Sequence, residues 1–332
     1  MKQISFAQAE YQNKKKVTRR ERFLAQMDAL VPWQRLINAL SSSYFPDAAG
    51  KRGRPPIGLE RMLRVYFLQQ WYALADEALE DAIYDSQAMR DFIGIDLAVE
   101  SVPDATTLLR FRHLLEQHAL TQRIFAEINA GLAEQRPFMR EGTIVDATIV
   151  AAAPSTKNQA KQRDPEMKQT KKGNQWFFGM KAHIGVDVVS GLTHSMVATS
   201  ANVADVTMVA DLVRDDDNTV FGDAGYTGMG EYLDEDKDDP DSRCCVAAKR
   251  STIRKMEDSP MKTLLLEIEK AKASVRSKVE YPFHVLKNLF GYRKVRYKGL
   301  AKNQAQLFTL FGLVKLVLAG RYPPCVEGSS AS

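Results

Sequence analysis

The spacing of apolar residues along the chain changes once, near Gly142. Before that point apolar side chains such as Leu59, Met62, Leu63 and Tyr66 recur every three or four residues, which is the period of a helix with one buried face. Four helices are predicted in this way: one from Ile57, one through Leu79 to Met89, one capped by Asp104, and one from Ile124 to Leu132. The first part of the chain is therefore predicted to be all-helical.

After Gly142 the pattern is that of short, mostly apolar strands. Strands are predicted at Thr143–Val150, Trp176–Val188, Leu192–Ala198, Thr219–Asp223 and Cys244–Ala248. Helices are predicted at Thr207–Val213 and Leu264–Phe290, and a lysine-rich loop at Pro154–Gln175. Three strands followed by alternating helices and strands is the order of the ribonuclease-H-like fold, although other α+β folds share parts of it.

We therefore predict an α+β protein with four parts. They are a basic N-terminal arm (1–56), a helical region (57–138), a ribonuclease-H-like domain with a mixed five-stranded sheet flanked by helices (139–322), and a tail (323–332). The apolar stretch Leu307–Gly320 is short for a bilayer and contains Lys315, so a packed helix is expected there. The N-terminus lacks the pattern of a signal peptide, and a cytoplasmic, nucleoid-associated protein is expected.

Basic residues are unevenly placed in this 332-residue chain, whose formal net charge is +5. Lysine and arginine outnumber the acids in residues 1–65 and again in residues 250–300. Two separated basic segments suggest that a polyanion touches the protein in two places, while solvated surface is the alternative. The three cysteines form neither a CxxC pair nor a cluster with histidine, which argues against a zinc site or a disulfide framework.

Two aspartates, Asp146 and Asp223, interrupt or end apolar strand patterns. A charge is costly there unless something binds it. If the two strands lie side by side, the carboxylates converge and repel each other, and a divalent cation such as Mg²⁺, which prefers oxygen ligands, reverses that penalty. For Asp223 alone the start of a turn is an alternative, whereas Asp146 lies in mid-strand among apolar residues.

A third acid, Glu280, lies on the long predicted helix with Arg276, His284 and Lys287. At about 100° per residue these four fall within roughly 80° of one another. Glu280 would bind metal, while Arg276 and Lys287 would meet the phosphates that flank a cut in a two-metal site. The simpler interpretation of Arg276 and Glu280 is an i,i+4 ion pair on the helix surface.

The segments around these acids resemble the catalytic blocks of bacterial insertion-sequence transposases with a DDE triad, and more narrowly the insertion sequence 5 family. The matching segments include Gly142-Thr-Ile-Val-Asp146-Ala-Thr, Phe221-Gly-Asp223-Ala-Gly-Tyr226 and Arg276-x3-Glu280-x6-Lys287. Related transposases often carry a tyrosine three residues before the motif arginine, and here that position is Ala273, which puts one phosphate contact in doubt.

The resemblance implies a DNA transposase in which Asp146, Asp223 and Glu280 are the catalytic and metal-binding residues. Such an enzyme cleaves the ends of its insertion sequence and joins the 3′-hydroxyls to target DNA by two-metal-ion phosphoryl transfer with Mg²⁺, for which Mn²⁺ can substitute. The implied partners are double-stranded DNA, as terminal inverted repeats and as target, and further copies of the chain in a homodimer or larger assembly. A ribonuclease-H-like nuclease without joining activity and a non-catalytic regulator derived from a transposase are the alternatives.

Further basic residues are candidates for DNA contact. Besides Arg276 and Lys287 they are Arg52 and Arg54 in an Arg-Gly-Arg-Pro segment, Arg110 and Arg112 on the third helix, Lys171 and Lys172 in the lysine-rich loop, and Arg293, Lys294, Arg296 and Lys298 after the Glu280 helix. A basic loop ahead of a helix and a flexible solvated loop are the alternatives for the first and third pairs. Trp176 could stack on an unpaired base or lie in the core.

Overall fold

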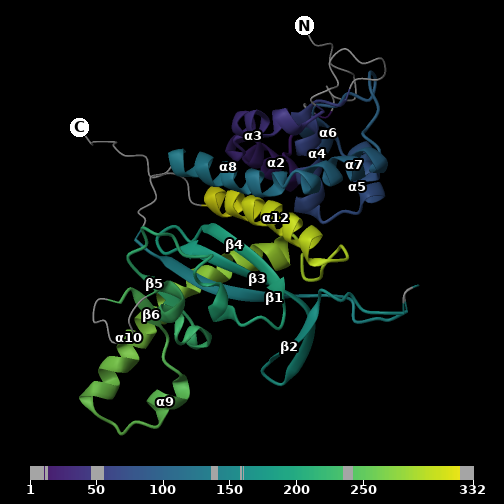
Figure 1. Cartoon of the computed structure of the whole chain (residues 1–332). Coiled ribbons are helices and arrows are strands. Elements are labelled where there is room, and N and C mark those ends of the chain that lie inside the picture. Colours follow the sequence, from purple (N-terminus) through teal and green to yellow (C-terminus); the bar gives the residue numbers. More distant parts are fainter. Residues whose placement is uncertain are drawn as a thin grey trace, which may run out of the picture. The chain divides into compact units, whose positions relative to one another are not determined.

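The computed structural model describes residues 11, 14–45, 56–135, 141–157, 159, 161–234 and 242–321. The chain forms two compact units, one of residues 1–134 with 319–332 and one of residues 135–318. Figure 1 labels the helices and strands of both units along the chain. Among the described residues, no helix combines the length and the apolar character needed to cross a membrane.

The regular structure of the first unit is helical throughout its described residues. Its helices are α2 (Arg19–Leu30), α3 (Trp33–Leu40), the short η1 (Ser41–Ser43), α4 (Leu59–Tyr72), α5 (Asp76–Asp85), α6 (Gln87–Ile93), α7 (Ala105–Gln117) and α8 (Leu120–Gln135). The predicted all-helical region is therefore confirmed. The third predicted helix begins as expected, because the Asp104 side chain accepts a hydrogen bond from the Thr107 N–H at 2.7 Å.

The core of this unit forms around α4, most of whose side chains are buried. Phe67 stacks on Trp33 with ring centroids 5.7 Å apart and meets Trp71 edge-on at 5.8 Å. Trp71 in turn meets Phe92 of α6 at 5.7 Å. Such aromatic pairs add to the stability that burial of their apolar surface already provides.

Two details of the helical unit differ from the sequence prediction. The second predicted helix is divided at Ser86, whose extended backbone ends α5 and whose side chain caps α6. The segment expected to be a basic arm contains α2 and α3, which bury Leu24, Met27, Leu36 and Leu40. Helix α2 begins with a capping box between Thr18 and Glu21, a signal present in the sequence but hidden among the basic residues.

In the second unit, six strands form one mixed sheet within the described residues. They are β1 (Thr143–Ala151), β2 (Lys168–Lys172), β3 (Gln175–Asp187), β4 (Thr193–Ser200), β5 (Val220–Gly222) and β6 (Cys244–Val246). β3 pairs antiparallel with β1, β2 and β4, whereas β5 pairs parallel with β1 and β6. The order β4-β3-β1-β5-β6 is that of a ribonuclease-H-like sheet, so the predicted fold class is confirmed.

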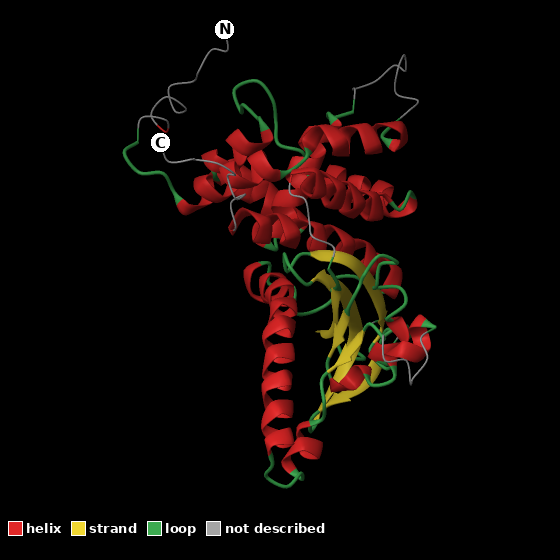
Figure 2. Cartoon of the chain, turned by 90° about the vertical axis from the view of Figure 1, so that its left-hand side faces the viewer, coloured by secondary structure: helices red, strands yellow, loops and turns green. Residues whose placement is uncertain are grey.

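Helices flank this sheet, as Figure 2 shows with helices in red and strands in yellow. After β6 the chain forms α9 (Arg250–Arg254), α10 (Pro260–Arg276), η5 (Ser277–Val279), α11 (Glu280–His284), the π-helical segment η6 (Val285–Leu289) and α12 (Leu300–Arg321). Helix α12 includes the apolar stretch that was predicted to pack, and Leu307, Phe311 and Lys315 within it are buried.

Two predicted elements of this unit are corrected. The helix expected at Thr207–Val213 is only the 3₁₀ turn η2 (Asp205–Met208), followed by irregular turns. The lysine-rich segment Pro154–Gln175, expected to be a loop, contains β2, which forms a hairpin with β3. Polar strands such as β2 lack the apolar alternation by which strands are recognised, so the prediction missed it.

Candidate active site

Asp146 lies on β1, and Asp223 directly follows β5, the adjacent parallel strand. The register pairs Thr143 with Val220 and Ile144 with Phe221, and β5 ends one residue later at Gly222. Continuing this register by two residues places Asp223 beside Asp146. Asp146 is in the middle of β1, but the neighbouring strand ends just before it, which opens one side of the sheet at that carboxylate.

Asp223 ends its strand by capping a turn. Its Oδ1 accepts a hydrogen bond from the Gly225 N–H at 2.7 Å and so begins the 3₁₀ turn η3 (Ala224–Tyr226). An ideal Cβ on Gly225 would lie 2.9 Å from that same oxygen, so a glycine is needed where the carboxylate binds the turn. The turn that was the alternative interpretation of Asp223 is therefore present, and it fixes the carboxylate next to β1.

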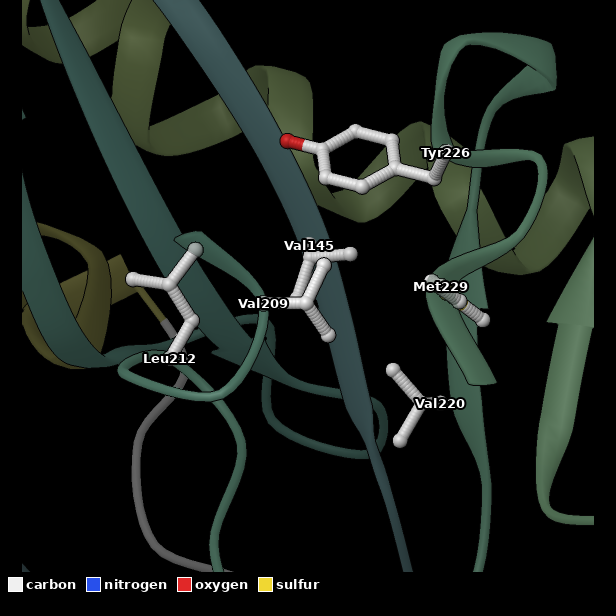
Figure 3. Close-up of a cluster of buried hydrophobic side chains, with 6 residues drawn as sticks. All are labelled: Val145, Val209, Leu212, Val220, Tyr226 and Met229. Atoms are coloured by element: carbon white, nitrogen blue, oxygen red, sulfur yellow. The ribbon is translucent and has the colours of Figure 1, made fainter. Parts of the chain in front are cut away.

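Tyr226 closes this turn against the sheet. Its side chain belongs to the buried cluster of Val145, Val209, Leu212, Val220, Tyr226 and Met229, which Figure 3 shows. An ideal Cβ at Gly222 would lie 2.7 Å from the Cβ of Tyr226, so the tyrosine can pack only because residue 222 has no side chain. Tyr226 thus anchors the segment that carries Asp223.

Glu280 lies on a helical segment that changes its hydrogen-bond pattern twice. Helix α10 ends at Arg276, the 3₁₀ segment η5 follows, and α11 begins at Glu280. Pro282 has no N–H with which to bind the carbonyl of Lys278, which explains why a regular α-helix does not continue through this point. The uninterrupted helix predicted for Leu264–Phe290 is thus corrected to a chain of helical segments.

The three carboxylates interact electrostatically. The pKa of Asp146 is raised to about 6, mainly by burial and in addition by the negative charges of Asp223 and Glu280. The backbone N–H of Ala147, which donates to Asp146 Oδ1 at 2.7 Å, and the charge of Arg276 act in the opposite direction. Two aspartates, a glutamate and an arginine from distant parts of the sequence therefore share one neighbourhood.

Lys287 reaches the same face of the sheet. Its Nζ donates hydrogen bonds to the hydroxyl of Thr148 at 2.6 Å and to the carbonyl of Ile149 at 3.0 Å. Thr148 follows Asp146 by two residues, so the two side chains point to the same side of β1. Burial lowers the pKa of Lys287, as do the charges of Lys172 and Arg293, whereas Glu280 raises it. Lys287 lies in the π-helical segment η6, a distortion that is frequent at functional sites.

Arg276 and His284, the other two residues of the predicted helix face, differ in burial and in hydrogen bonding. The Nε of Arg276 is buried and has no hydrogen-bond partner among the described residues, while its charge acts on Asp146. A buried donor of this kind is available to an acceptor that enters the site. His284 is exposed and its Nδ1 lies 2.9 Å from the side-chain amide of Asn288.

The donor set of the site fits a hard divalent cation in its chemistry. Carboxylate oxygens are the ligands that Mg²⁺ prefers, and a cation would offset both the burial and the repulsion by Asp223 and Glu280 that raise the pKa of Asp146. Among the described residues, however, no group of three acids, histidines or cysteines is close enough to hold one metal ion together. The carboxylates are neighbours at electrostatic range and do not form a closed ligand cage.

The basic strip after η6 lies at the end of β1. Lys294 forms a parallel bridge with Ala151, and the backbone of Ala151 exchanges hydrogen bonds with Arg293 and Val295. The side chains of Arg293, Lys294, Arg296 and Lys298 are exposed. Just beyond the strip, the N–H of Gly299 donates to Asp164 Oδ2 at 2.7 Å, and the N–H of Leu300 donates to Glu166 Oε2 at 2.6 Å. These two acids of the segment before β2 therefore bind the backbone at the start of α12.

The other predicted DNA contacts are placed differently. Lys171 and Lys172 are exposed on β2, and Arg110 is exposed on α7. Arg112 is 8% exposed and donates to Asp76 Oδ2 at 2.8 Å, so it is a buried ion-pair partner, and its prediction as a DNA contact is corrected. Arg52 and Arg54 lie outside the described residues.

A polar network that sequence reasoning did not find holds the start of β1. The hydroxyl of Thr143 donates to Asp217 at 2.5 Å, and Arg214 pairs with both Asp217, at 2.7 Å, and Asp187, at 3.2 Å. Asp187 also accepts hydrogen bonds from the turn after β3. His194 Nε2 lies 2.8 Å from the hydroxyl of Thr143. No local motif marks these residues, because they come together only through the pairing of the strands.

Comparison with known families gives two matches that together cover most of the chain. The family described as Transposase DDE domain matches residues 137–314. The family described as Transposase domain (DUF772) matches residues 12–114. No solved structure matches the chain significantly.

Proposed function

Because the chain belongs to the family of transposases with a DDE domain, we propose that it cleaves the ends of an insertion sequence and joins the freed 3′-hydroxyls to target DNA. The observation that carries this proposal is the electrostatic coupling of Asp146 with Asp223 and Glu280. Three acids that repel one another in a partly buried site are unfavourable in a protein that only binds DNA, a polyanion.

In this proposal the three carboxylates hold divalent cations, Mg²⁺ or Mn²⁺. Bound there, these ions would supply Lewis acidity and stabilise the charge that develops on the attacking and leaving oxygens. Asp146 and Asp223 are held by backbone N–H groups through one oxygen each, which fixes their orientation. Glu280 is exposed at the start of α11 and can change its side-chain conformation as ligands enter.

The cationic side chains of the site bind the DNA backbone. Arg276 offers a buried Nε to a phosphate oxygen, and Lys287 is held by Thr148 two residues from Asp146. Both charges would favour the extra negative charge of the transition state over the ground state. Arg293 and Lys294 extend this positive surface along the end of β1.

Two displacements at phosphorus account for the reaction. In the first, a water oxygen attacks the phosphorus at the element's end, the bond from phosphorus to the 3′-oxygen breaks, and a 3′-hydroxyl and a 5′-phosphate result. In the second, that hydroxyl attacks a phosphorus of target DNA and the 3′-oxygen of the target leaves. Both steps are in-line substitutions, so one set of residues serves both and no covalent bond to the protein is needed.

The insertion sequence 5 family is the narrower group to which we propose that the chain belongs, on the motifs around Asp146, Asp223 and Glu280. The proposed partners are the terminal inverted repeats, target DNA and at least one further copy of the chain, since two ends must be paired. We propose that the reaction takes place in the bacterial cytoplasm, at the nucleoid.

The test uses the DNA that flanks the gene, in which inverted repeats would mark the element's ends. The full chain is incubated with labelled end DNA, target DNA and Mg²⁺, in parallel with Asp146→Asn and with Asp211→Asn, which changes an exposed aspartate outside the site. We expect cleavage and joining with wild type and Asp211→Asn, and binding alone with Asp146→Asn. Cleavage without joining would indicate a nuclease, and binding without cleavage by all three proteins would indicate a regulator; either result contradicts the proposal.

A further inference from the structure

The hairpin formed by β2 and β3 extends beyond the main sheet. β1 pairs with β3 only as far as Gly179, where the next N–H, that of Ala152, still donates to the carbonyl of Phe178, and β4 pairs with β3 only from Met180 onward. Residues 175–177 therefore pair with β2 alone. Gly173, with a φ of +60°, lies in the two-residue turn between the strands. Figure 1 shows β2 projecting away from β1 and β4.

One face of this arm carries an exposed tryptophan and a lysine. The register pairs Lys171 with Trp176 and Gln169 with Phe178, and paired residues of antiparallel strands point to the same side. Trp176 is 65% exposed, which is unusual for so large an apolar side chain in a strand. The guanidinium carbon of Arg163 lies 5.4 Å from the centre of the Phe178 ring, so a second cation covers the inner part of this face.

The charge of the arm identifies the kind of partner. Residues 168–178 contain Lys168, Lys171 and Lys172 and no acid. Lys172, whose side chain points to the opposite face of the arm from Lys171, is near enough to Lys287 for its charge to lower the pKa of Lys287, as does that of Arg293. An acid-free arm with three lysines, one of them close to Lys287 of the candidate active site, is complementary to a nucleic-acid backbone.

The exposed ring of Trp176 indicates which form of nucleic acid binds the arm. Bases inside a duplex present only their edges to a protein, whereas an unpaired base presents a flat apolar face on which an indole can stack. A lysine beside the ring can neutralise the phosphate of the same nucleotide. An exposed aromatic side chain beside Lys171 on the same face is therefore suited to single-stranded or frayed DNA.

We propose that the β2–β3 hairpin is a DNA-binding arm, and that Trp176 stacks on an unpaired base of the strand that enters the candidate active site. The inference deepens the proposed function and rests on it for the identity of the DNA. Trp176 lies eight residues before Ile184, the β3 partner of Asp146, so the base that it binds lies along the strand and away from the cut itself. If a second copy of the chain binds Trp176 instead, the experiment below distinguishes it.

Tryptophan fluorescence reports on the arm without any catalysis. The chain has three tryptophans; Trp71 is 3% exposed and Trp33 is stacked on Phe67 in the helical unit. The full-length protein is titrated in the absence of divalent metal, once with a blunt DNA duplex and once with the same duplex carrying a short single-stranded 3′ extension. We expect the extension to quench the emission, and Trp176→Phe to abolish that quenching while retaining part of the affinity.

Affinity measurements distinguish the contribution of Trp176 stacking to DNA binding from that of the Lys171 charge. Trp176→Ala is expected to weaken binding of the extended duplex about fivefold or more and to leave binding of the blunt duplex unchanged. Lys171→Ala should weaken both and reduce the dependence of affinity on salt by about one ion. Tyr232→Ala, which removes another exposed aromatic ring of the same unit, is the matched control and should change neither.

Three outcomes would overturn the inference. If both DNAs bind but neither affects Trp176 fluorescence, the arm does not contact a base, and the transposase proposal stands. If Trp176→Ala alters the oligomeric state while DNA binding is unchanged, the arm binds another protein copy. If neither DNA binds at all, both this inference and the proposed function fail.

Discussion

The ammonium group of Lys287 donates a hydrogen bond to the hydroxyl of Thr148 at 2.6 Å, which joins the helical segment after Glu280 to the strand of Asp146. The same nitrogen also binds the carbonyl of Ile149, and Thr148 is 8% exposed. This contact fixes the position of the helix along β1. It thereby sets the distance between Glu280, seven residues before Lys287, and Asp146, two residues before Thr148.

Lys287 is therefore expected to act both as an anchor and as a phosphate ligand. Lys287→Met should lower the rate of DNA cleavage by about a hundredfold, because charge at the reacting phosphate is lost as well as position. Thr148→Val keeps the ammonium group and should lower the rate by less, about fivefold, through loss of one hydrogen bond. The check is cleavage rate at saturating DNA, with affinity measured separately. Equal effects of the two substitutions would exclude a direct role of the charge.

The glycine at 222 is predicted to be essential for the position of Asp223. In Gly222→Ala the new methyl group would meet Tyr226, whose displacement moves the turn that carries Asp223. We expect a loss of about 1–3 kcal/mol in the free energy of unfolding, with cleavage reduced well beyond what that loss explains. Gly58→Ala is the control, since a Cβ at Gly58 meets no atom within 4 Å. Normal cleavage by Gly222→Ala would show that Tyr226 does not position Asp223.

The raised pKa of Asp146 predicts a dependence of stability on pH in the absence of metal. Its folded-state pKa of about 6 lies above the ordinary value of 3.8, so the folded protein holds this proton more tightly than the unfolded chain. Stability contributed by the protonated group is present below about pH 4 and is lost as pH rises through 6. Asp146→Asn should thus be more stable than wild type at pH 7, by up to about 3 kcal/mol.

Urea unfolding of both proteins between pH 4 and pH 7 measures this difference. The advantage of Asp146→Asn should grow between pH 4 and 6 and shrink when Mg²⁺ is added, because an ion that binds the native wild type stabilises it. Asp211→Asn, at an exposed position, should show no such trend. Parallel curves for wild type and Asp146→Asn would contradict the raised pKa of Asp146.

Arg112 is predicted to stabilise the helical unit without touching DNA. Removing one partner of its ion pair with Asp76, as in Arg112→Met or Asp76→Asn, should cost about 2–4 kcal/mol because a charge is left buried. The double substitution should cost less than the sum of the two. DNA affinity and its salt dependence, measured on folded Arg112→Met, should equal those of wild type; a smaller salt dependence would restore Arg112 as a phosphate contact.

The sequence predicts this fold well where local pattern and burial agree. The strand around Asp146, the cap at Asp104 and the order of the central strands follow from apolar spacing and known cap residues. The strand β2 could not be predicted in this way, because its residues are polar and it forms only by pairing with β3. The prediction of a helix at Thr207–Val213 is wrong for the opposite reason: the segment has apolar residues at helical spacing, but they pack into the buried cluster from turns.

The sequence predicted which acids form the candidate site, but it did not predict how they are arranged in space. Asp146 is conspicuous in an apolar strand, whereas Glu280 is one acid among several on its helical segment. The break near Pro282 and the anchor at Thr148 arise from tertiary contacts, which periodicity does not show. Arg112 illustrates the reverse error, because a basic residue on a predicted helix surface proved to be buried and paired with the half-buried Asp76.

The central claim is that Asp146, Asp223 and Glu280 together bind a divalent cation, and Mn²⁺ binding measured by electron paramagnetic resonance tests it most directly. Wild type and Asp211→Asn are titrated with Mn²⁺ in the presence of DNA, beside Asp146→Asn, Asp223→Asn and Glu280→Gln. We expect each substitution in the triad to weaken Mn²⁺ binding about tenfold or more, and Asp211→Asn to leave it unchanged. Equal Mn²⁺ affinity in all five proteins would contradict this claim.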